Sequence, residues 1–200
     1  MKVRHPLLLA VFFLLYPPGN VVFADGTSTN RVARPENWAI KLQRPGLPNL
    51  HQVTTNLYRG AQPTAEGMAT LKSMGIKTVV NLRNFHSDTD ELSGINVKAA
   101  RLHMNPWHAE DEDVIQFLKI VSNTNNLPAF VHCQRGADRT GMMCAMYRIT
   151  VCGWTREEAI RELRDGGFNF NTAWKNIIRY IENADVKKIK ERAGLVAGKS

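Results

Sequence analysis

Cysteine is scarce in this sequence, and its spacing excludes two common uses of the residue. The 200 residues contain three cysteines, Cys133, Cys144 and Cys152, and no C-x-x-C pair. Three cysteines do not make the paired framework of a disulfide-rich fold, and no cluster of cysteine and histidine has the spacing of a zinc site. We therefore predict no disulfide framework, no metal site and no cofactor.

Long hydrophobic runs are missing after the first 24 residues. Met1–His5 is charged, Leu7–Tyr16 is apolar and Val22–Ala24 ends in a small residue, which is typical of a secretory signal peptide cleaved after Ala24. We expect residues 1–24 to be that signal, the protein to be exported to a bacterial periplasm, and the mature form to have no stable membrane insertion. A two-proline break makes the signal imperfect, so an uncleaved segment that anchors the protein in the inner membrane is the alternative.

Acidic residues are outnumbered by basic ones. The chain has 26 Lys and Arg against 18 Asp and Glu, a net charge of +8. This excess favours anionic partners, but the basic residues are scattered and lack the interleaved aromatics of a nucleic-acid surface. We therefore expect no nucleic-acid partner. The sequence does not indicate the oligomeric state. The basic residues after 184 predict a solvated helix end, and we treat 184–200 as a basic C-terminal tail.

The stretch Val131–Gly141, which reads V-H-C-Q-R-G-A-D-R-T-G, has the pattern of a phosphate-binding loop. An apolar strand ends at Cys133, and an apolar helix begins near Thr140. Backbone N–H groups of such a loop and the N-terminus of the helix attract an anion. The same field favours the thiolate form of Cys133 and makes it a nucleophile. Arg139 offers a rigid pair of donors that matches a phosphoryl group.

Other residues of this stretch have predicted supporting roles. His132 is expected to be a buried, hydrogen-bonded ring that shapes the loop, and the Thr140 hydroxyl to bond the sulfur. The residues predicted to surround the phosphate are Gln134, Arg135, Gly136, Ala137, Asp138 and Arg139.

The pattern H-C-x-x-G-x-x-R-T-G resembles the signature of the cysteine-dependent protein tyrosine and dual-specificity phosphatases. The run L-Y-R-G-A-Q-P at 57–63, the strand at 77–82 and Y-R-I through G-W at 147–154 are similar to compact, exported bacterial members of that family (TpbA-like). The likeness covers roughly residues 53–183, which we take as the phosphatase domain. The resemblance implies a single α/β domain with a mostly parallel central sheet flanked by helices.

Hydrophobic periodicity leads to the same fold. Short apolar runs alternate with amphipathic segments, which predicts a mostly parallel sheet with its site at the strand ends. Residues 25–52 show no clear period and are predicted to be an extended lead-in. Strands are expected at 56–59, 78–82, 97–104 and 128–132, and helices at 63–75, 112–124, 140–152, 155–166 and 174–181.

The general acid is less well defined by the sequence. The family places an Asp on the loop that here corresponds to Pro106–Asp111, and Asp111 is our first choice. Acidic residues at a helix start, however, also stabilise the helix dipole without any catalytic role. Asp138, inside the phosphate loop, is the alternative acid and resembles the arrangement in myotubularin-like phosphatases. His108 and Glu110 are further substitutes.

Three functions fit these residues. The first is hydrolysis of phosphotyrosine in proteins, with or without dual specificity, through a cysteinyl-phosphate intermediate. The second is hydrolysis of inositol phosphates or phosphoinositides, because Arg135 adds positive charge for a polyanionic ligand. The third is a catalytically weak module that binds phosphorylated partners. In each case the expected partner is a phosphorylated protein or another phosphomonoester.

Overall fold

The computed structural model describes residues 34–105, 108 and 110–196, which belong to one compact unit. The predicted signal peptide and residues 25–33 of the lead-in lie outside the described residues. The strands are β1 (Ile40–Lys41), β2 (His51–Gln52), β3 (Leu57–Gly60), β4 (Thr78–Asn81), β5 (Lys98–Arg101) and β6 (Ala129–His132). The helices are α1 (Ala65–Ser73), α2 (Asp111–Ser122), α3 (Asp138–Thr150), α4 (Arg156–Asp165), α5 (Lys175–Asn183) and α6 (Val186–Ala193), with a short 3-10 turn at Thr124–Asn126.

The strands form one sheet in the order β1-β2-β3-β6-β4-β5. The pairs β3–β6, β6–β4 and β4–β5 are parallel, whereas β1–β2 and β2–β3 are antiparallel. The predicted α/β fold with a mostly parallel sheet is confirmed. The two antiparallel strands come from the segment predicted as an extended lead-in, where the periodicity of a two-residue strand is too short to detect.

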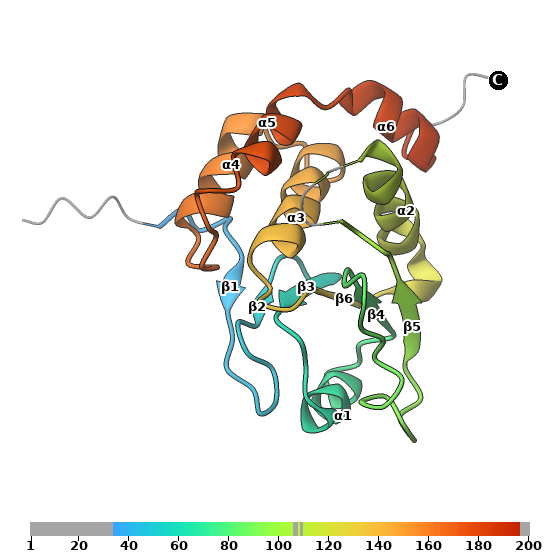
Figure 1. Ribbon diagram of the computed structural model, residues 1–200. Coiled ribbons are helices and arrows are strands. Elements are labelled where there is room, and N and C mark those ends of the chain that lie inside the picture. Colours follow the sequence, from blue (N-terminus) through green and yellow to red (C-terminus); the bar gives the residue numbers. More distant parts are fainter. Residues whose placement is uncertain (1–33, 106–107, 109, 197–200) are drawn as a thin grey trace, which may run out of the picture. The chain divides into compact units, whose positions relative to one another are not determined.

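Helices cover both faces of the sheet, α1 on one and the others on the opposite face (Figure 1). Side chains alternate across each strand, so Val79 and Phe130 pack in the smaller core with α1. Val80 and Val131 pack in the larger core with the remaining helices. The two central strands β4 and β6 are therefore buried on both sides, which fixes where their carboxyl ends lie.

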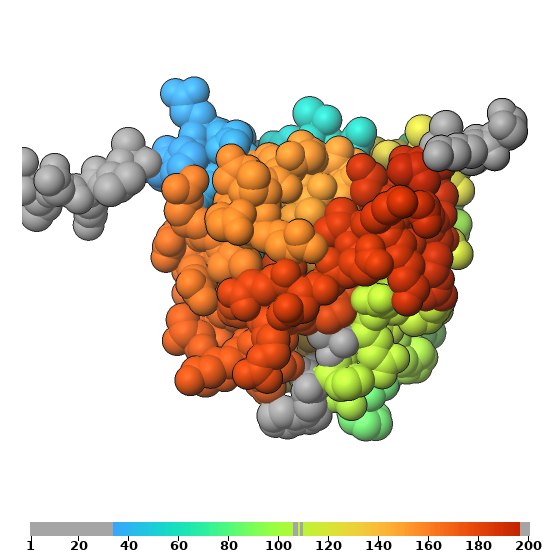
Figure 2. All heavy atoms as spheres, turned by 90° about the horizontal axis from the view of Figure 1, so that it is seen from above, coloured from blue at the N-terminus to red at the C-terminus, as the bar shows by residue number. Residues whose placement is uncertain are grey.

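The predicted basic tail contains α6. Its apolar face holds Ile189, which is buried, and the helix packs against α2 (Figure 2). Arg192 forms an ion pair with Glu112 of α2. The helix that follows the phosphate loop begins at Asp138, two residues earlier than predicted. Within the described part of the chain, no helix has the length and apolar character needed to cross a membrane.

Candidate active site

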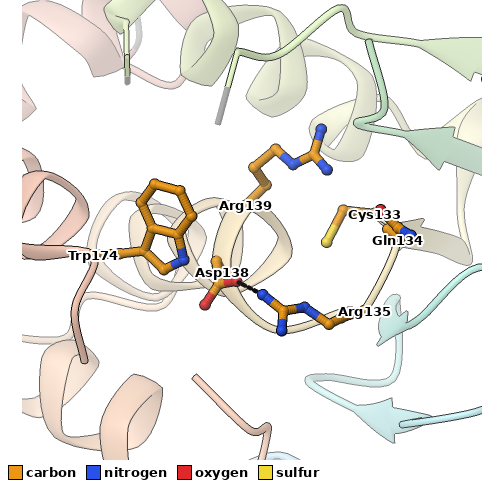
Figure 3. A pocket seen from close by; sticks show the side chains of 6 residues that line it. All are labelled: Cys133, Gln134, Arg135, Asp138, Arg139 and Trp174. Atoms are coloured by element: carbon orange, nitrogen blue, oxygen red, sulfur yellow. Dashed lines mark hydrogen bonds and ion pairs between the residues drawn. The ribbon is translucent and has the colours of Figure 1, made fainter. Parts of the chain in front are cut away.

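Cys133 lies directly after β6 and before α3, at the carboxyl edge of the parallel strands. Ligands bind at this edge in open α/β sheets. The side chain lines a small cavity of about 90 Å³ (Figure 3). The residues around the cavity are Cys133, Gln134, Arg135, Asp138, Arg139 and Trp174. The structure therefore brings the predicted nucleophile and the predicted phosphate-binding arginine into one pocket.

Cys144, the buried cysteine of α3, has a different setting. Burial raises the pKa of Cys144 to about 11, so this group stays a thiol in the core. Cys133 is 4% exposed but opens to the pocket. Among the two, Cys133 is the one that a ligand can reach.

The phosphate loop, residues 133–139, is held from behind by its carbonyl groups. The carbonyl oxygens of residues 134–137 all accept hydrogen bonds from groups outside the loop. Gln62 N donates to the carbonyl of residue 134 at 3.2 Å, and Asn49 Nδ2 to that of residue 135 at 3.0 Å. Arg59 Nη2 donates to the carbonyls of residues 136 and 137, at 2.7 and 3.3 Å. These peptide bonds are trans, and the N–H and C=O of a trans unit point in opposite directions. The N–H groups of residues 135–138 are therefore directed to the other, anion-binding side.

Gly136 allows the loop to pack this tightly. Its φ is +67°, and a Cβ at this position would collide with the backbone of Gly60 at the end of β3. Any residue with a side chain would therefore be strained and would push the loop away from the sheet.

Arg59 of β3 is the main support behind the loop. Its side chain is 1% exposed, and its Cζ lies 3.8 Å from the centroid of the Phe168 ring. None of the ion pairs between described residues involves it. Burial lowers the pKa of Arg59, but a guanidinium stays charged in proteins. A buried cation that forms no ion pair within the described part of the chain favours an anion in front of the loop.

His132 is buried and bonded, as its supporting role requires. Its Nε2 lies 2.9 Å from Asp88 Oδ2, and Gln62 Nε2 donates to Asp88 Oδ1 at 2.8 Å. Burial raises the pKa of Asp88, but the hydrogen bonds from His132 and Gln62 outweigh burial and bring it below its ordinary value. The carboxylate of Asp88 thus fixes the ring that precedes Cys133.

The segment between β4 and β5, which carries Asp88, contains three side chains that could ligate a metal. His86 Nε2, Asp88 Oδ1 and an oxygen of Glu91 lie within 4.8 Å of one another. His86 Nε2 is 3.1 Å from Glu91 Oε1, close enough for a hydrogen bond. The bonds to His132 and Gln62 already account for the position of Asp88, so this group needs no ion to explain it.

Arg139 of α3 is oriented by backbone carbonyls. Its Nη1 donates to Leu82 O at 3.0 Å and to Met104 O at 3.4 Å. Leu82 directly follows β4, and Met104 follows β5. A guanidinium has five N–H donors, so Nε and Nη2 can serve a ligand. The Thr140 hydroxyl is buried and has no hydrogen-bond partner among the described residues.

Asp111, our first choice of acid, faces another group. It accepts a hydrogen bond from the Tyr180 hydroxyl at 3.0 Å, and its Oδ2 lies 4.0 Å from Lys188 Nζ. It is not among the lining residues of the described pocket. The exposed side chains of His108 and Glu110 lie 3.7 Å apart. The rest of that loop, residues 106, 107 and 109, lies outside the described residues.

Asp138, the alternative acid, lines the pocket and has two partners. Its Oδ1 accepts from Asn171 N at 2.9 Å, and its Oδ2 lies 3.4 Å from Arg135 Nη2. It therefore ties the segment before α5 to the phosphate loop. The Arg135 side chain is 70% exposed and turns toward Asp138 (Figure 3).

Comparison with known proteins agrees with this geometry. A family model described as "DSP-PTPase phosphatase fused to NAD+ Kinase" matches residues 48–173. The chain belongs to the dual-specificity phosphatase family. This phosphatase is 31% identical over 188 residues to the dual specificity protein phosphatase TpbA of Pseudomonas aeruginosa. The matched region covers 92% of this chain and 82% of TpbA. The predicted family, fold and phosphatase class are confirmed.

Solved structures and a plant protein extend the comparison. A crystal structure of TpbA matches this phosphatase with a TM-score of 0.72 and 30% identity, over 81% of this chain and 99% of that chain. A TpbA variant in complex with pTyr matches with a TM-score of 0.72 and 29% identity over the same shares. An inositol diphosphatase of Arabidopsis thaliana is 24% identical over 153 residues, 72% of this chain and 73% of that protein.

The sequence did not predict the residues that support the loop or line its pocket from other segments of the chain. Asn49, Arg59, Asp88 and Trp174 were not candidates, because none is near Cys133 in sequence. A signal existed for Arg59, which is a charged residue in the short strand L-Y-R-G that pairs with β6. For the others, only the folded chain reveals the contact.

Proposed function

We propose that this phosphatase hydrolyses phosphomonoesters, phosphotyrosine in proteins above all, with Cys133 as the nucleophile. The observation that carries the proposal is the pocket that Cys133 and Arg139 line together, in front of a loop whose carbonyls are bonded from behind. The relationship to TpbA, and the pTyr complex of a TpbA variant, support phosphotyrosine as the substrate.

The reaction has two steps. The Cys133 thiolate attacks phosphorus in line with the leaving oxygen, so that an S–P bond forms as the P–O bond breaks. Arg139 and the loop N–H groups hold the equatorial oxygens and stabilise their charge, without any need for a metal. Water then attacks the cysteinyl-phosphate, the S–P bond breaks, and phosphate and the thiolate are released.

The leaving oxygen takes a proton from a general acid in the first step. We propose Asp111 for this role, with Asp138 as the alternative. Asp111 would have to turn away from Tyr180, whereas Asp138 already lies at the pocket but is bonded to Asn171 and Arg135. Catalytic hydrogen bonds often form only when substrate binds, so neither arrangement excludes a carboxyl group.

Inositol phosphates are the second candidate substrates. Arg135 at the pocket and the related plant inositol diphosphatase favour them. Against them, Asp138 pairs with Arg135 and offsets its charge.

A substrate panel tests the proposal. Rates on a phosphotyrosine peptide, a phosphothreonine peptide and inositol phosphates would be measured for the native protein and for Cys133→Ser, each with and without a chelator. We expect the phosphotyrosine peptide to be the best substrate, no effect of the chelator, and a loss of roughly a thousandfold or more in Cys133→Ser. Turnover by Cys133→Ser at the native rate would contradict the nucleophile. Tight binding without turnover by the native protein would instead indicate a phosphate-reading module.

We also propose that the protein is exported to the periplasm after cleavage behind Ala24. The charged, apolar and small-residue pattern of residues 1–24 supports this. N-terminal sequencing of protein recovered from a cell fractionation would test it. A mature chain beginning at Asp25 in the soluble periplasmic fraction is expected, and an intact Met1 in the membrane fraction would favour the anchored alternative.

A further inference from the structure

Trp174 is a feature of the pocket that the proposed mechanism does not use. It lines the cavity together with Cys133 and lies across the pocket from the sulfur (Figure 3). Among the described lining residues it is the only aromatic one. It is also the N-cap of α5 but makes no side-chain capping bond, although this position favours Ser, Thr, Asp or Asn. Helix capping therefore does not explain a tryptophan here; the ring packs against the larger core on one side and lines the pocket.

The segment that carries Trp174 is fixed to the phosphate loop. Phe168 is buried and lies against the guanidinium of Arg59, behind the loop. Asn171 N donates to Asp138 Oδ1 at 2.9 Å, and Trp174 N donates to Asn171 O at 3.0 Å. These contacts hold the backbone of the segment that carries Trp174 next to the phosphate loop.

The size of the cavity decides what Trp174 can contact. At about 90 Å³, the cavity is much smaller than the roughly 300–1,000 Å³ of pockets that enclose a whole organic ligand. It can hold the phosphoryl end only, so the group that carries the phosphate must lie at the mouth. The half-buried indole of Trp174 lines the same cavity, and aromatic rings pair with one another by offset stacking or edge-to-face contact.

We propose that Trp174 forms an aromatic subsite that receives the ring of an aryl phosphate and makes this phosphatase prefer phosphotyrosine to phosphothreonine. Asp138 is a positioning residue for this subsite, acting through Asn171. The inference rests on the proposed function and names the substrate preference of the same pocket.

The test measures binding, so that it does not depend on turnover. In the Cys133→Ser protein, dissociation constants would be determined by calorimetry for a phosphotyrosine peptide, for a phosphothreonine peptide of the same flanking sequence and for inorganic phosphate. Adding Trp174→Leu should weaken binding of the phosphotyrosine peptide roughly two- to tenfold and leave the other two constants within error. Trp174→Phe should restore most of the affinity, because a ring remains.

Two results would overturn the subsite. One is equal weakening of all three ligands, which would indicate that Trp174 only shapes the phosphate site. The other is unchanged affinity for the phosphotyrosine peptide. If thermal unfolding shows that Trp174→Leu does not fold, Trp174→Met is used in its place, because methionine fills more of the space of the indole ring.

Kinetics on the protein with native Cys133 separate this proposal from the proposed function. Trp174→Leu should raise KM for the phosphotyrosine peptide with little change in kcat, since the ring contact is made before the chemical step. If the native protein hydrolyses neither peptide while the binding difference persists, the proposed hydrolysis fails and the subsite stands.

Discussion

The two sides of the phosphate loop are built in opposite ways. Behind the loop, Arg59, His132 and Asp88 are each at most 5% exposed, and each is hydrogen-bonded within the core. In front of it, at the pocket, the side chain of Arg135 is 70% exposed. We expect the buried rear to hold the proposed anion site in place, and the exposed front to select the substrate and the acid. Changes behind the loop should therefore affect stability and every substrate, and changes in front should affect particular substrates or pH values.

The largest effect expected in front of the loop comes from the general acid. Replacing the true acid with its amide should lower kcat on a phosphotyrosine peptide by roughly 10²- to 10⁴-fold. It should also abolish the fall of kcat at high pH, because that fall reports loss of the acidic proton. The measurement is the pH profile of Asp111→Asn and of Asp138→Asn.

A neighbouring carboxyl group provides the control. Burial, with the charges of Glu110 and Glu112, raises the pKa of Asp113 on the first turn of α2. Asp113→Asn should keep the native profile. If only Asp138→Asn loses the fall of kcat at high pH, Asp138 and not Asp111 is the acid. If only Asp113→Asn loses this fall, both candidates are rejected.

Behind the loop, Arg59→Met should have the largest effect. The Gly136 carbonyl would lose its donor, at roughly 1–3 kcal/mol of unfolding free energy, whereas the Ala137 carbonyl keeps the bond from Gly141 N at 2.9 Å. Loss of the buried cation should also slow alkylation of Cys133 by iodoacetamide at about pH 6, where only a thiolate reacts fast. Arg59→Lys keeps the charge and should retain more of the alkylation rate than Arg59→Met does. Equal rates in both variants would show that the charge of Arg59 does not act on the sulfur.

Asp88→Asn should be milder and should depend on pH. Because the pKa of Asp88 is lowered in the folded protein, its carboxylate contributes stability above the ordinary value of about 3.9 and loses that contribution as pH falls below it. We expect Asp88→Asn to lower the unfolding free energy by roughly 1–3 kcal/mol near neutral pH. Urea unfolding should show that the difference in unfolding free energy between Asp88→Asn and the native protein becomes smaller as the pH falls. A difference that grows as the pH falls would contradict a negatively charged Asp88 in the folded protein.

Arg135→Ala should have the smallest effect. Its pair with Asp138 is exposed, and such pairs contribute less than about 1 kcal/mol. Unfolding free energy should barely change, and KM for a phosphotyrosine peptide should rise a few-fold at low salt and match the native value at about 1 M salt. A selective loss of inositol phosphate turnover would instead favour the second candidate substrate.

The sequence alone determined the phosphate loop, the α/β class and the family, because these depend on local patterns. A strand, a cysteine, four further residues and a helix lie within one continuous stretch, and short apolar runs mark β4 and β6. It also placed most helices to within two residues, with α3 beginning at Asp138 rather than Thr140.

Only the tertiary structure decided what surrounds that loop. Asn49, Arg59, Asp88 and Trp174 reach it from four other segments, and nothing in the periodicity of those segments indicates which way their side chains turn. The short strands β1 and β2 and the packing of α6 on α2 are of the same kind. Local propensity sets the conformation of neighbouring residues along the chain, whereas these contacts join residues far apart in sequence and form only when the sheet and helices have assembled.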